Sequence, residues 1–126
     1  MRLLVDSHVA LWWLEGNDKL GPDARRQLES ADEVYFSAAT PWELGIKRAL
    51  GKLDFPDGLA DALVAGGFTE LQVSAAHGEL AASLPPHHHD PFDRMLIAQA
   101  RAEALVLVTA DRAMQPYDLV LIDARG

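Results

Sequence analysis

The chain has 126 residues, 49% of them hydrophobic, so it is long enough to bury one core but too short for two ordinary domains, and a single domain over residues 1–126 is expected. It has no cysteine, which excludes disulfides and thiolate metal sites, and its N-terminal segment lacks the features of a signal peptide or a membrane span, so a soluble cytoplasmic protein with no membrane partner is expected. The net charge of −8 argues against a protein that holds nucleic acid by bulk positive potential. Nucleic-acid binding is compatible with this charge if some carboxylates gather at a metal site and the cations that face phosphate are local.

Short apolar runs rich in β-branched residues alternate with segments of helical patterning. The runs lie at residues 3–5, 34–36, 71–73, 106–108 and 120–122. This alternation predicts an α/β fold in which helices cover a parallel sheet of about five strands. Prolines mark three helix starts and glycines mark helix ends, which predicts six or seven helices. These markers are Pro22, Pro41 and Pro91, and Gly16, Gly51 and the pair Gly66–Gly67.

The first predicted helix is apolar nearly all round over residues 9–14, which include Trp12 and Trp13. Such a helix is buried, either in the core of its own chain or against another subunit. Farther along, three consecutive histidines at residues 87–89 do not have the i, i+4 spacing of helical metal ligands. A loop is predicted there instead.

Four carboxylates are placed where a functional site is expected. Asp6 follows the first strand and Asp111 follows the fourth, and the carboxyl ends of parallel strands are where α/β sheets bind ligands. For each of these two residues alone, a helix N-cap is the competing interpretation. Glu43 matches a capping box with Thr40, yet it shares a helical face with three apolar residues. That face comprises Ile46, Leu50 and Leu53.

Asp93 presents a similar choice, because Asp90 is the natural N-cap and Asp93 lies in the first turn of the same helix. Ile97, Ala100 and Ala104 share a helical face with Asp93 and are apolar residues suited to packing against a sheet. Asp93 is therefore expected to point toward the sheet edge. Two carboxylates about 4 Å apart would repel by roughly 4 kcal/mol at an effective dielectric near 20. An all-oxygen site without cysteine suits Mg²⁺ or Mn²⁺, which would remove that cost.

These segments resemble the PIN-domain nucleases and, within them, the VapC-type toxins of bacterial toxin–antitoxin pairs. The resemblance covers essentially the whole chain and is carried by residues 4–7, 37–44, 90–100 and 108–111. It implies a PIN-like three-layer α/β/α fold and a Mg²⁺- or Mn²⁺-dependent endoribonuclease, a hydrolase that cuts RNA phosphodiester bonds, with one or two ions. It also implies a homodimer and a VapB-like antitoxin partner.

Carried over residue by residue, the resemblance makes Asp6, Glu43, Asp93 and Asp111 the catalytic and metal-binding acids, with Asp6 and Asp93 as the direct ligands. Ser7 and Thr109 are expected to support them, and Asp90 is interpreted as a helix cap. A short basic patch could contact RNA phosphates, although a solvated helix face explains it equally well. Its members are Lys47, Arg48 and Lys52. Arg94 and Arg112 follow two of the acids, as phosphate contacts or as supporting residues.

Three other classes of protein compete with this interpretation. A signalling receiver domain would require paired acids after the first strand, a phosphate-accepting aspartate after the third and a lysine after the fifth, and the sequence has none of these. A non-catalytic PIN-like binding module would usually lack some of the four acids. A PIN-like nuclease that cuts DNA remains the main alternative among active enzymes.

Overall fold

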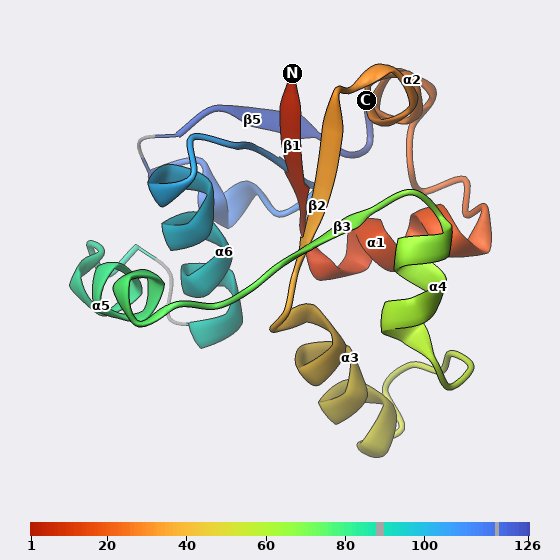
Figure 1. The fold of residues 1–126 in the computed structure, drawn as a ribbon, viewed down its shortest axis with the longest axis horizontal. Coiled ribbons are helices and arrows are strands. Elements are labelled where there is room, and N and C mark those ends of the chain that lie inside the picture. The colour runs from red at the N-terminus through yellow and green to blue at the C-terminus, as the bar shows by residue number, and fades with distance from the viewer. Residues whose placement is uncertain (88–89, 118) are drawn as a thin grey trace.

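The computed structural model describes residues 1–87, 90–117 and 119–126, and this part of the chain contains one sheet of five parallel strands (Figure 1). The strands are β1 (Arg2–Val5), β2 (Glu33–Ser37), β3 (Thr69–Leu71), β4 (Val106–Thr109) and β5 (Leu121–Asp123). Their order across the sheet is β3-β2-β1-β4-β5. The predicted parallel sheet of about five strands is confirmed.

Six α-helices and one short 3-10 helix lie between the strands of the described residues, in agreement with the predicted number. They are α1 (Ser7–Glu15), α2 (Pro22–Ser30), α3 (Thr40–Ala49), α4 (Leu59–Ala65), α5 (Ala75–Ser83), α6 (Pro91–Ala102) and the 3-10 helix η1 (Arg112–Met114). Pro22 and Pro91 occupy the first helical position, as predicted. Gly16 ends α1 in the left-handed region at φ 62°, which glycine adopts at little cost because it has no Cβ.

The sheet lies between two helical layers, as the alternation of side chains along β1 shows. Leu3 and Val5 belong to a core shared with α1, α2 and α4, whereas Leu4 belongs to a second core shared with α5 and α6. Figure 1 shows α5 and α6 on one side of the strands and α1, α2 and α4 on the other. The predicted three-layer arrangement is therefore confirmed. None of the described helices is long and apolar enough to cross a membrane.

The strand order changes direction between β1 and β4. The chain moves outward from β1 to β2 and β3, then crosses to the other side of β1 to form β4 and β5. In open parallel sheets, such a switch point leaves a crevice outside the carboxyl ends of the strands, where ligands bind. Asp6 directly follows β1, and Asp111 follows β4 after one intervening residue, so both acids lie beside the two strands that border this point.

Two details of the predicted elements are wrong. The strand expected at residues 71–73 lies instead at Thr69–Leu71, because β3 is an edge strand that is mostly exposed and whose apolar residues do not mark it. Ala104, expected on the buried face of α6, lies beyond the end of that helix, is exposed and has φ 54°.

The two adjacent tryptophans of α1 pack within their own chain. Trp12 is buried in the core, and the half-buried Trp13 ring packs against Phe68 with the ring centroids 5.8 Å apart. Of the two interpretations offered for this apolar helix, burial in its own core is therefore correct. The tryptophan that faces solvent is Trp42 of α3, which is 67% exposed.

Candidate active site

Asp6 joins the end of β1 to the start of α1 and uses its two carboxylate oxygens differently. Oδ1 accepts the backbone N–H groups of His8 and Val9 and so caps α1, as the competing interpretation predicted. Oδ2 accepts the hydroxyl of Thr109 at 2.6 Å. Burial raises the pKa of this carboxyl, and these hydrogen bonds, together with the nearby His8, offset the rise only in part. A cation bound beside this buried carboxylate would offset its negative charge.

Thr109 connects the two sides of the switch point. Its hydroxyl donates to Asp6 and accepts the backbone N–H of Asp111 at 3.0 Å, so one side chain holds the acid after β1 and the turn that carries the acid after β4. Asp111 in turn caps η1, because its Oδ1 accepts the N–H of Ala113 at 2.9 Å. The half-buried Asp111 thus lies at the predicted edge of the sheet.

Replacement of Thr109 by valine should lower the free energy of unfolding by about 1.5–3 kcal/mol, the usual value of a hydrogen bond to a charged group. The change keeps the shape of the side chain but leaves a buried carboxylate oxygen without its donor. Urea denaturation would measure the loss. Thr109→Ser keeps the hydroxyl and serves as the control, and a valine variant as stable as the serine variant would contradict this role.

A second hydrogen-bond network joins α1 to α3. The Ser7 hydroxyl donates to Glu43 Oε1 at 2.5 Å and lies 3.2 Å from the Thr40 hydroxyl. The other oxygen of Glu43, Oε2, accepts Lys47 Nζ at 2.9 Å. Ser7, Thr40 and Glu43 are all buried. Glu43 is therefore held from two directions, by a hydroxyl and by an ammonium.

The third group of acids lies at the start of α6. Asp90 is the N-cap, because its Oδ1 accepts the backbone N–H groups of Phe92 at 2.8 Å and Asp93 at 3.3 Å. Asp93 is half-buried in the first turn, and farther along its face Ile97 and Ala100 are fully buried. Asp93 therefore lies on the side of α6 that faces the sheet, as predicted.

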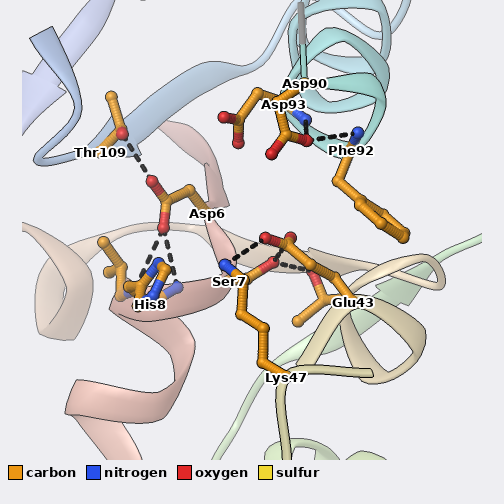
Figure 2. A network of polar contacts seen from close by, with 11 residues as sticks. Asp6, Ser7, His8, Glu43, Lys47, Asp90, Phe92, Asp93 and Thr109 are labelled. Carbon is orange, nitrogen blue, oxygen red and sulfur yellow. Dashed lines mark hydrogen bonds and ion pairs between the residues drawn. The ribbon is translucent and has the colours of Figure 1, made fainter. Parts of the chain in front are cut away.

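Figure 2 shows Asp6, Glu43 and Asp93 around one region between the end of β1, α3 and the start of α6, with the Asp6 carboxylate turned toward Thr109 and the start of α1 and the Glu43 carboxylate bonded to Ser7 and Lys47. Within the described ranges, no three histidine or acidic side chains lie close enough together to hold a single ion as they stand. The donor set is nonetheless entirely oxygen, and Asp6 is a buried acid whose hydrogen-bond donors are a hydroxyl and backbone amides. These residues fit a hard divalent cation such as Mg²⁺ or Mn²⁺.

Two predictions about the surroundings of Glu43 are wrong. The capping box does not form, since α3 begins at Thr40 and no side chain caps it, while the Thr40 hydroxyl turns to Ser7. The expected buried stripe does not form either, because Ile46 and Leu50 are exposed. Glu43 is buried because α3 packs its Thr40–Glu43–Leu44 side against α1, close to the sheet edge.

The basic residues near the acids have different environments. The Arg48 guanidinium binds Asp57 and the carbonyl of Phe55, each at 3.0 Å, so it fastens the loop after α3. Arg94 donates to the carbonyls of Ala81, Leu84 and Pro85 and ties the end of α5 to α6. Within the described part of the chain, the other three basic residues do not bind backbone carbonyls in this way. Lys52 and Arg112 are exposed, and Lys47 is half-buried and contacts Glu43.

A small cavity of about 230 Å³ adjoins Asp111 on the side of β5. Its lining residues also include Arg112, Gln115, Leu121 and Ile122. The predicted histidine loop comes earlier in the chain than this cavity: His87 lies in an exposed turn, while residues 88–89 lie outside the described part.

Two features of this site were not expected from the sequence. The Thr40 hydroxyl joins the Ser7–Glu43 network, and Lys47 pairs with Glu43 rather than belonging to a solvated face. The second feature had a readable signal, because Glu43 and Lys47 have the i, i+4 spacing that favours an ion pair on a helix.

The chain belongs to the PIN domain family, whose model matches residues 3–118. It is also 33% identical over 122 residues to Ribonuclease VapC22 from Mycobacterium tuberculosis (strain ATCC 25618 / H37Rv), and the match covers 91% of each chain.

Solved structures share the fold. A VapBC2 complex from Rickettsia felis, bound to a DNA fragment from its promoter, matches with a TM-score of 0.70 and 17% identity over 98% of each chain. A toxin–antitoxin complex from Klebsiella pneumoniae matches with a TM-score of 0.69 and 15% identity over 97% of each chain.

Proposed function

We propose that this chain is a divalent-metal-dependent endoribonuclease and the toxin of a VapBC-type toxin–antitoxin pair. The observation that carries the proposal is the gathering of an acid that follows β1 with acids of α3 and α6 around one region beside the switch point of a PIN-domain sheet. The relative with 33% identity is named a ribonuclease, which supports RNA rather than DNA as the substrate.

In this proposal Asp6 and Asp93 are the direct ligands of Mg²⁺ or Mn²⁺, and Glu43 and Asp111 complete the acidic set. A bound divalent cation activates the attacking water and offsets negative charge on the scissile phosphate. Thr109 orients Asp6, and Ser7 orients Glu43, through the hydrogen bonds described above. The cap that Asp6 provides to α1 fixes its backbone, so that the carboxylate needs little reorganisation.

The proposal includes a VapB-like antitoxin and a homodimer as partners. The solved structures that share the fold include a VapBC2 complex and a toxin–antitoxin complex, and this supports an antitoxin. For the homodimer, Trp12 does not supply the surface, because it is buried in the core of its own chain. Trp42 and Phe92 pack edge to face, with their ring centroids 4.9 Å apart, in an apolar groove of about 720 Å³, and an exposed apolar surface of this kind is typical of a protein contact.

Cleavage of matched RNA and DNA tests the proposal directly. The purified chain should cut single-stranded RNA when Mg²⁺ or Mn²⁺ is added, should stop when EDTA is added, and should leave the DNA of the same sequence intact. Gel analysis of end-labelled strands would measure all three results. Cutting of the DNA would favour the alternative PIN-like nuclease, and cutting of neither strand would favour a non-catalytic binding module.

A further inference from the structure

Lys47 and Glu43 form an ion pair across one turn of α3, with Nζ and Oε2 2.9 Å apart. Exposed pairs of this kind contribute little to stability. Here the Glu43 side chain is only 7% exposed and the Lys47 side chain is 29% exposed, so the acid is buried while the base reaches the surface. Loss of one partner from a pair with a buried member leaves an uncompensated charge. The pair is thus part of the site rather than a surface detail.

The two buried acids of the set, Asp6 and Glu43, differ in what neutralises them. Asp6 accepts hydrogen bonds from neutral groups, namely the Thr109 hydroxyl and two backbone amides. Glu43 already has a cation of its own chain, and its second oxygen accepts the Ser7 hydroxyl. A divalent cation therefore offsets more unbalanced charge at Asp6 than at Glu43.

We propose that Glu43 is a positioning residue that holds the Lys47 ammonium at the rim of the acidic pocket, where the ammonium binds a phosphate of the RNA. This inference rests on the proposed ribonuclease function. An ammonium has three N–H donors, and Glu43 is the one hydrogen-bond partner that Lys47 has among the described residues. The remaining donors are available to a phosphate oxygen.

Charge supports the same assignment. A chain with a net charge of −8 needs local cations to hold a polyanion next to an acidic pocket. Of the predicted basic patch, Arg48 is bound to Asp57 and to a backbone carbonyl, and Lys52 lies beyond the end of α3. Lys47 is the member of that patch that directly contacts one of the four acids.

The test compares four single variants with the wild type, together with the Lys47→Met/Glu43→Gln double variant and Asp93→Asn. Lys47→Met removes the charge, Lys47→Arg keeps it, and Glu43→Gln keeps the shape of the acid without its charge. Lys19→Met removes one exposed lysine beyond the far end of α1 and is the matched control. Calorimetric titration with Mn²⁺ in the absence of RNA measures metal affinity. Cleavage at several salt concentrations measures kcat and KM for RNA.

Lys47→Met should raise KM by about tenfold or more and reduce the salt dependence of RNA binding by about one counterion. Its Mn²⁺ affinity should stay equal or rise, because the freed Glu43 carboxylate adds negative charge to the pocket. Lys47→Arg should restore KM. Glu43→Gln should raise KM in the same way while keeping Mn²⁺ affinity within about threefold, and the double variant should add little to either single change.

The inference is overturned if Glu43→Gln loses Mn²⁺ affinity as completely as Asp93→Asn, or if Lys47→Met changes KM no more than Lys19→Met. In the first case Glu43 is a direct ligand, and in the second Lys47 is only a helix-surface partner. A wild type that cuts no RNA would refute the ribonuclease proposal. The Mn²⁺ titrations would still decide whether Glu43 is a ligand.

Discussion

Asp93→Asn should abolish metal-dependent cleavage, lowering the rate by at least about 100-fold, while the fold survives. The substitution keeps the size of the side chain and one oxygen but removes a charge from the acids gathered beside the end of β1. If Asp93 served only the helix dipole of α6, the result would be the opposite. Stability would fall by up to about 1 kcal/mol and cleavage would be unchanged.

The chain offers a matched control for this experiment. Asp61 occupies the third position of α4, the same position that Asp93 holds in α6, and it is exposed and outside the acidic set. Asp61→Asn removes the same kind of helix-dipole interaction and should leave cleavage intact. RNA cleavage and thermal melting would be measured side by side for both variants. A wild-type cleavage rate for Asp93→Asn would refute its role as a metal ligand.

The effect of Asp6→Asn on the melting temperature should change sign when metal is added. Without metal, asparagine should raise the melting temperature by several degrees at neutral pH, because it keeps the oxygen that caps α1 and removes a buried charge. With saturating Mg²⁺ the wild type should become the more stable protein. A ligand at about 100 times its Kd stabilises the folded state by roughly 2.7 kcal/mol, and the variant should gain little of this.

The pH dependence of this difference follows from the pKa of Asp6. Because burial raises that pKa above its ordinary value of 3.8, the folded protein binds the proton more tightly than the unfolded chain does. The metal-free wild type should therefore lose stability as the pH rises from about 4 toward neutrality, relative to Asp6→Asn. Thermal melts in EDTA across this range would measure the difference. A constant difference between the two proteins would show that Asp6 carries no such cost.

The fold and the positions of three of the acids could be predicted because both depend on local patterns. Alternating apolar runs and helical segments determine a parallel sheet, and a parallel sheet places every residue that follows a strand at one edge. Asp6 and Asp111 could be placed from this rule alone. Asp93 could be placed because its apolar neighbours at i+4 and i+7 determine which face of α6 is buried.

The partners of those acids could not be predicted, because they depend on contacts between distant segments. The Ser7–Thr40 and Asp6–Thr109 contacts join residues 33 and 103 positions apart, and no periodicity encodes either of them. The error at Glu43 has the same origin. Helical spacing indicates which residues share a face but not which face packs, and α3 buries a polar side against Ser7 while Ile46 and Leu50 face solvent.

The Thr109–Asp6 hydrogen bond has a consequence for when the protein becomes active during synthesis. β1 is synthesised before its partner β4, and Asp6 and Glu43 are synthesised before Asp93 and Asp111. A nascent chain therefore carries Asp6 without the strand whose Thr109 orients it until β4 has been translated. The proposed acidic set is complete only once Asp111 has also been made.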